Sequence, residues 1–203
     1  MHYGSGVERQ LTRRGEQRRQ QIMDFAAERF ATNGYHPTSV AEIVEGLGVG
    51  KGVFYWYFSS KEELFTEMLA GAYRDLRRRQ GEAIGDTTDP LERIARGVRA
   101  SMEWSVEHRD VFRLFQLAAG EARFATVLRK GEKGAISDAV RHIAAAMDAG
   151  VVTKGDPNLL AHAMLGVTIH LVQRHLLGTP DAIEDAVAYC LHGIGVASDE
   201  RRP

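Results

Sequence analysis

The chain has 203 residues, 44% of them hydrophobic and 26% charged, and its formal net charge is −1. This is the composition of an ordinary globular protein with enough residues to bury one or two cores. No run of residues reaches the roughly 18 apolar positions of a membrane-spanning helix, and the polar N-terminus has no signal-peptide core. We therefore expect a cytoplasmic protein without a membrane partner. The single cysteine, Cys190, excludes an internal disulfide.

Basic residues are only weakly concentrated toward the N-terminus. Residues 1–61 carry eight basic and six acidic side chains, whereas the remainder carries 18 and 21. The net charge therefore gives no argument for a nucleic-acid partner, and its distribution gives a slight one.

A short arm and one helix open the chain. Residues 1–13 have no apolar period and are expected to form a disordered arm. Residues 14–33 carry apolar side chains at helical spacing. This helix is expected to end at Asn33-Gly34, because glycine readily adopts the left-handed conformation of a C-cap.

Two short helices follow, separated by a glycine-containing turn. Thr38 and Ser39 supply N-cap hydroxyls for the first of them. Glu42 stands three residues after Ser39, which is the spacing of a capping box. The glycines of residues 46–50 predict a turn, and residues 51–58 predict the second short helix.

A long helix and a break come next. Ser60 and Glu63 form a second capping-box pattern, which predicts a long helix over residues 61–81. Residues 81–89 are rich in glycine, aspartate and threonine and are the clearest compositional break in the chain.

The C-terminal half is also helical in pattern. Asp89-Pro90 and Asp156-Pro157 are N-caps followed by proline at the first helical position. Gly131 and Gly134 weaken one of the predicted helices. No window alternates apolar and polar residues, so we expect an all-α protein with about nine helices. The helices predicted here cover residues 90–108, 110–119, 121–149, 157–177 and 181–195.

The pair of short helices has the dimensions of a helix-turn-helix. A helix that enters the major groove needs small residues at its start and polar or aromatic groups behind them. Gly50-Lys51-Gly52, followed by Tyr55, Trp56 and Tyr57, meets that need. Lysine offers a cation to phosphate or guanine, and tyrosine hydroxyls can donate to phosphate.

Core packing and nucleotide-binding motifs are the alternative interpretations of the same segment. Val53, Phe54 and Phe58 are expected in the core, and Tyr57 has simple packing as an alternative to DNA contact. The glycines fit neither the Walker phosphate loop nor the spaced-glycine dinucleotide pattern, so no nucleotide cofactor is expected.

The segment resembles the tetracycline-repressor (TetR/AcrR) family. The matching text is IMDFAAERFATNGY (22–35), TSVAEIV (38–44), GVGKGVFYWYF (48–58) and SKEELF (60–65). The resemblance implies a DNA-binding transcriptional regulator with an N-terminal three-helix helix-turn-helix domain and a helical C-terminal domain.

The resemblance also assigns DNA contacts. Gly50 stands where the family usually has serine, so an N-cap and a phosphate contact are missing there. Leu47 stands where alanine is usual. The implied contacts are Thr38 and Ser39 on phosphate, Gly50, Lys51 and Gly52 on base edges and backbone, Tyr55 and Trp56 on bases or sugars, and Tyr57 and Lys61 on phosphate.

The resemblance further implies a small-molecule pocket in the C-terminal domain. Ordinary core packing is the alternative for each residue named for it. The expected lining is Met102, Trp104, Phe115, Phe124 and Met164.

The last two predicted helices carry wide apolar stripes that need cover. The resemblance implies a homodimer through these helices, which would match an inverted-repeat operator. Burial within one subunit is the alternative.

No catalytic residue, metal site or cofactor is indicated, because the histidines lack zinc-ligand spacing and no nucleophile motif is present. We expect no enzyme. The expected regulator is a repressor that a small-molecule effector releases from double-stranded operator DNA. Its alternatives are an activator or co-repressed regulator of the same fold, and a DNA-binding protein without a ligand. The expected domains are a disordered arm (1–13), the helix-turn-helix (14–60), a connecting helix (61–81) and a ligand-binding and dimerisation domain (82–203).

Overall fold

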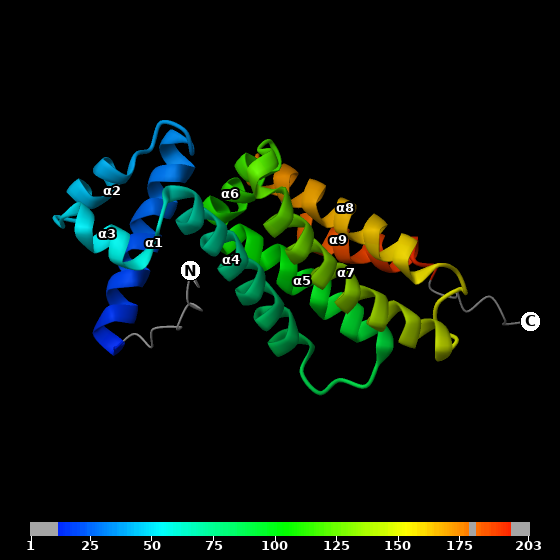
Figure 1. The fold of residues 1–203 in the computed structure, drawn as a ribbon. Coiled ribbons are helices and arrows are strands. Elements are labelled where there is room, and N and C mark those ends of the chain that lie inside the picture. Colours follow the sequence, from blue (N-terminus) through cyan, green and yellow to red (C-terminus); the bar gives the residue numbers. More distant parts are fainter. Residues whose placement is uncertain (1–11, 179–181, 196–203) are drawn as a thin grey trace, which may run out of the picture. The chain divides into compact units, whose positions relative to one another are not determined.

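The computed structural model describes residues 12–178 and 182–195, which form nine α-helices, one short 3₁₀ helix and no strand (Figure 1). The all-α expectation is confirmed. Within the described residues no helix is both long enough and apolar enough to cross a bilayer. The helices are α1 (Arg13–Asn33), α2 (Val40–Gly46), α3 (Lys51–Tyr57), α4 (Lys61–Ile84), α5 (Pro90–Glu107), α6 (Arg109–Ala119), η1 (Ala122–Phe124), α7 (Ala125–Asp148), α8 (Pro157–Leu176) and α9 (Ala182–Gly193).

The chain divides into two compact units, and the division falls inside α4, between Met68 and Leu69. The sequence placed the end of the first domain earlier, at residue 60. The first turns of α4 belong to the first unit because Leu64 and Phe65 are fully buried in its core.

Capping side chains begin five of the described helices, four of them at residues that the sequence predicted. Each accepts a hydrogen bond from a backbone N–H in the first turn, which satisfies a donor that the helix itself leaves unpaired. Residues 1–11 of the expected arm lie outside the described residues, and Thr12 is already the cap of α1. The capping bonds join Thr12 to Gly15 (3.2 Å), Ser39 to Glu42 (3.1 Å), Ser60 to Glu63 (3.0 Å), Asp89 to Leu91 (2.9 Å) and Asp156 to Asn158 (2.9 Å).

Aromatic rings form the core of the first unit. The ring of Phe30 lies 5.5 Å from that of Tyr35 and 5.2 Å from that of Phe65, measured between centroids. Helices α1 and α2 approach so closely that a Cβ atom at Gly46 would lie 2.1 Å from the Phe25 ring. Only glycine fits at this point without displacing α1 or the ring.

Helices α5, α7, α8 and α9 pack against one another in the second unit (Figure 1). Cys190 lies within their shared core, and burial raises the pKa of its thiol. It behaves as a small buried apolar residue. The core comprises Ile94, Ala95, Val98, Ile136, Ile143, Ala146, Met147, Val152, Ala161, Met164, Val187, Cys190 and Ile194.

Helix α7 runs unbroken through the two glycines that the sequence marked as weak points. Both positions face α4. A Cβ atom at Gly131 would lie 2.1 Å from the Tyr73 ring, whereas one at Gly134 would lie 3.3 Å from the Arg77 guanidinium. The glycine at 131 is therefore explained by the close approach of an aromatic side chain.

Replacing Gly131 with alanine is expected to destabilise the protein. Overpacking against the rigid Tyr73 ring typically costs about 1–3 kcal/mol, and the better helix propensity of alanine offsets roughly 1 kcal/mol of it. Urea denaturation followed by circular dichroism measures the change in the free energy of unfolding.

Gly134→Ala is the matched control on the same helix. The three atoms nearest to a Cβ there all belong to the flexible Arg77 side chain, so alanine is expected to leave the stability unchanged or to raise it. Equal losses in the two variants would contradict the explanation by close approach.

Candidate nucleic-acid interface and internal cavity

Backbone hydrogen bonds around Gly48 fix the turn between α2 and α3. The N–H of Gly48 donates to the Glu45 carbonyl (3.0 Å), and the N–H of Val49 donates to the Val44 carbonyl (2.9 Å). This is the Schellman pattern of helix ends. It requires the left-handed conformation of Gly48, whose φ is +64° and which glycine adopts without strain.

The start of α3 is an open tip made of Gly50, Lys51 and Gly52. Gly50 is the N-cap and makes no side-chain capping bond, as expected where serine is missing. A Cβ atom at Gly50 or Gly52 would meet no atom within 4 Å, and Lys51 between them is exposed. A large partner can therefore approach the backbone here.

Behind the tip, α3 has an exposed and a buried aromatic side. Tyr55 and Trp56 are 55% and 52% exposed, although large aromatic side chains are usually covered. Phe54 and Phe58 are buried, as expected of core residues. Tyr57 is half-buried, and its ring lies edge-on to that of Trp56 at 4.6 Å between centroids. Rings left exposed on a helix of seven residues indicate a contact surface.

Thr38 and Ser39 have different positions although they are adjacent. Ser39 is exposed at the N-terminus of α2. Thr38 is fully buried, and its hydroxyl donates toward the carbonyls of Gly34 (2.9 Å) and Arg29 (3.4 Å). Contrary to the expectation of a phosphate contact, the Thr38 side chain holds the turn that follows α1.

Lys61, at the start of α4, makes contacts within its own unit. Its Nζ atom donates to the carbonyls of Tyr35 (2.8 Å) and Thr38 (2.7 Å), with a longer contact to His36 (3.4 Å). The same ammonium lies 4.4 Å from the centroid of the Tyr35 ring. An ammonium has three donors, and this arrangement directs them to the loop between α1 and α2.

A cavity of about 810 Å³ lies within the second unit, walled by α4, α5, α6, α7 and α8. Three of the five residues expected at a pocket, Trp104, Phe115 and Met164, line it. Met102 does not line it. Its side chain is fully buried in a cluster with Phe112, Val172 and Ala186. Phe124 is fully buried in η1 and is also absent from the lining.

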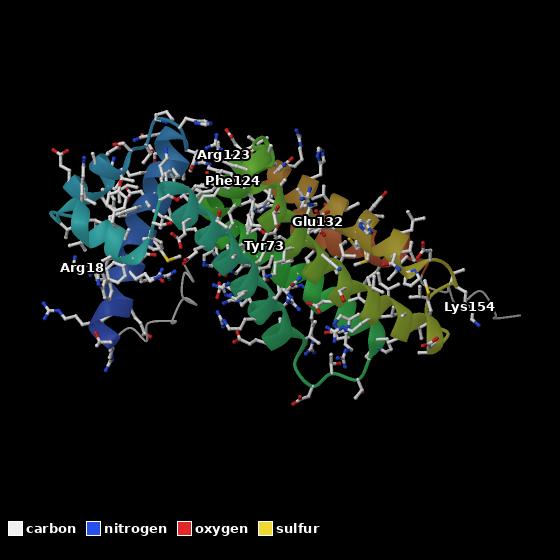
Figure 2. The ribbon with its side chains drawn as sticks, in the orientation of Figure 1. Arg18, Tyr73, Arg123, Phe124, Glu132 and Lys154 are labelled. Carbon is white, nitrogen blue, oxygen red and sulfur yellow. The ribbon has the colours of Figure 1, made fainter. Side chains whose placement is uncertain are left out.

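Several polar side chains also line the cavity, and the apolar periodicity of the sequence does not predict them. Tyr73 of α4 and Glu132 of α7 are labelled in Figure 2. Burial and then the charge of Glu132 raise the pKa of Tyr73 to about 12, so the phenol keeps its proton. In the part of the chain that the structure describes, no three His, Cys, Asp or Glu side chains are grouped to hold a metal ion. The other polar lining residues include Gln80, Arg93, Gln116, Asp138, Arg141, His142 and Thr168.

A hydrogen bond connects α5 to α4 in the cavity wall. The indole N–H of Trp104 donates to the carboxylate of Asp75 (2.7 Å). Bonds from Arg78 and then from Trp104 lower the pKa of Asp75, which remains charged. On its other side Trp104 stacks on His108 with 4.7 Å between centroids and 18° between planes.

Helices α8 and α9 expose large apolar side chains. Leu159 and Ile169 of α8 are 67% and 41% exposed, and Tyr189 of α9 is 63% exposed. Met164, Val172 and Cys190 on the same helices are buried. Each helix therefore has one face in the core of its own unit and a second face that nothing in the described chain covers.

The sequence of the first unit matches a known family model, "Bacterial regulatory proteins, tetR family", over residues 22–68. The uncharacterized HTH-type transcriptional regulator YhgD of Bacillus subtilis is 28% identical over 157 residues, which cover 76% of this chain and 82% of that protein. The HTH-type transcriptional repressor KstR2 of Mycobacterium tuberculosis is 37% identical over 91 residues, so the chain spans less than half of that relative's length, 45%.

Solved structures share the fold over nearly the whole chain. The fatty acid degradation regulator FadR from Bacillus halodurans superposes with a TM-score of 0.79 at 18% identity, covering 88% of this chain and 97% of that chain. The family model identifies the first unit by its sequence. The likeness of fold extends through the second unit as well. Residues 22–68 therefore belong to the tetR family of bacterial regulatory proteins, and the chain is a DNA-binding transcriptional regulator.

Proposed function

We propose that the chain is a cytoplasmic, homodimeric repressor that leaves its operator when a small molecule occupies the cavity of the second unit. The open tip of α3, with exposed aromatic rings behind it, is the observation that carries the DNA-binding part. The cavity of about 810 Å³ supports the ligand-binding part, since small-molecule sites commonly have roughly 300–1,000 Å³.

The proposed DNA contacts lie on α3 and at the start of α2. The glycines let the helix backbone approach the groove, Lys51 supplies a cation, and the aromatic residues pack on bases or sugars. Thr38 and Lys61 act as positioning residues, because their polar atoms bond to the loop before α2. The contacting residues are Ser39, Gly50, Lys51, Gly52, Tyr55, Trp56 and Tyr57.

The proposed dimer forms through the exposed faces of α8 and α9. Leu159, Ile169 and Tyr189 would be buried there against a second copy of the chain. A two-fold dimer presents its two recognition helices about 34–36 Å apart, which matches one turn of DNA and an inverted-repeat operator.

Helix α4 couples ligand to DNA in this proposal. It begins in the first unit and ends in the second, and its residues Tyr73 and Gln80 line the cavity. A ligand that shifts Tyr73, or Trp104 with its bond to Asp75, acts directly on α4. The ligand needs different affinities for the two states, and such couplings are typically worth about 1–3 kcal/mol.

Lys51→Ala is expected to weaken operator binding about tenfold or more without changing the melting temperature. The side chain is exposed on α3, so its loss removes one contact to DNA and leaves the fold intact. Fluorescence anisotropy with duplexes from the DNA flanking its own gene, at fixed salt, measures the affinity.

Two lysines serve as controls. Lys154→Ala, at an exposed position of the second unit, should bind the operator as the wild type does. Lys61→Met should lower the melting temperature, because it removes the charged donor from three carbonyls. Unchanged operator affinity in Lys51→Ala would refute the assignment of the α3 tip to DNA.

Tyr189→Glu is expected to convert the dimer to a monomer. The residue is 63% exposed on α9, so glutamate is harmless to the isolated subunit but places a charge in the proposed apolar interface. Sedimentation velocity at micromolar concentration measures the state. Leu117→Glu, 38% exposed on α6, is the control and should remain dimeric. A dimeric Tyr189→Glu variant would exclude this face as the interface.

A further inference from the structure

The charged side chains of the cavity are not evenly spread along it. Arg93 lies in the first turn of α5, and Arg141 and His142 lie in the C-terminal part of α7. Glu132 lies ten positions earlier on α7 than His142, which corresponds to about 15 Å along the helix. The cavity therefore has a basic stretch at Arg93, Arg141 and His142. The carboxylate of Glu132 lies well apart from it, and Arg77 of α4, which also lines the cavity, lies between them beside Gly134 and Asp138.

The basic stretch has more positive charge than its own carboxylate neutralises. Asp138 accepts hydrogen bonds from both Arg77 (2.6 Å) and Arg141, so one carboxylate serves two guanidinium groups. Arg93 donates to the backbone carbonyl of Thr87 (3.1 Å). Among residues 12–178 and 182–195, Arg93 has no carboxylate partner.

His142 adds a neutral donor beside these cations. Burial lowers the pKa of its imidazole, and the charges of Arg93 and Arg141 lower it further against the opposing effect of Asp138. The ring is therefore uncharged near neutral pH and can donate an N–H without repelling the guanidinium groups. An incoming anion would meet two positive groups and one neutral donor.

The rest of the lining is largely apolar. Ile94 and Val98 of α5, Ile136 of α7, and Met164 and Leu165 of α8 form its walls. The lining extends along α7 from Leu128 to Ile143, a length of about 22 Å at the rise of an α-helix. This is enough for an elongated apolar group, and it leads to the basic stretch.

We propose that the cavity binds an amphipathic organic anion, with its anionic group at Arg93, Arg141 and His142 and its apolar body between α5, α7 and α8. This identification of the ligand class rests on the proposed function, in which the cavity is the effector site. A cationic head group would instead be attracted to the carboxylate of Glu132, so the test includes a cationic ligand.

Three probes with the same apolar chain and different head groups test the charge preference. Isothermal titration calorimetry of the full-length protein with dodecanoate, dodecan-1-ol and dodecyltrimethylammonium measures the three affinities. Dodecanoate is expected to bind at least tenfold more tightly than either of the others. Equal or tighter binding of the alcohol or the ammonium compound overturns the proposal, and so does the absence of dodecanoate binding.

A pair of arginine variants on α5 tests the place of the head group. Arg93→Met should weaken dodecanoate at least tenfold and leave dodecan-1-ol unchanged. Arg96→Met is the matched control, because Arg96 pairs with Glu92 (2.8 Å) and does not line the cavity. Equal effects of the two variants on dodecanoate, or an equal loss for acid and alcohol in Arg93→Met, place the anion elsewhere and overturn the assignment.

Operator release is measured separately, so that the two hypotheses can fail independently. Adding dodecanoate to the protein–operator complex reports release by fluorescence anisotropy. Tight, Arg93-dependent binding of dodecanoate without release supports the ligand class and contradicts the proposed release mechanism. Release by the alcohol or the ammonium compound, with no effect of dodecanoate, supports the mechanism and overturns the ligand class.

Discussion

The ammonium group of Lys61 is the contact on which the arrangement of the first unit depends. It joins the first residue of α4 to the carbonyls of Tyr35 and Thr38, so the loop before α2 is tied to the helix that follows α3. Thr38 completes the tie by bonding back to the end of α1. Helices α2 and α3 are therefore held at both ends, by the loop before α2 and by the start of α4. These contacts leave the exposed side of α3 uncovered.

The second unit keeps an internal space because its wall is held by specific contacts. Tyr73 lies against Gly131 where no larger residue fits, Trp104 donates to Asp75, and Gln80 donates to the carbonyl of Gly97 (3.3 Å). These contacts fix α4 beside α5 and α7 without filling the volume between them.

Local signals in the sequence predicted most of the fold but not all of the site. N-caps, capping boxes and the glycine turn depend on neighbouring residues, so Ser39, Asp89 and Gly48 were identified correctly. Long-range contacts leave no such pattern. Nothing near Lys61 in sequence indicates that carbonyls more than 20 positions away surround it. The choice between Ser101 and Met102 for the cavity similarly depends on how α5 is rotated in the assembled core.

The placement of the two tryptophans gives each of the two units an intrinsic fluorescent reporter. Trp56 stands on α3 with half of its surface in solvent, and Trp104 is 2% exposed at the cavity wall. Indole emission responds to the polarity around the ring, so the two residues emit from distinct environments. In a variant that retains one tryptophan and has phenylalanine at the other position, the emission reports a change around that one ring without any attached dye.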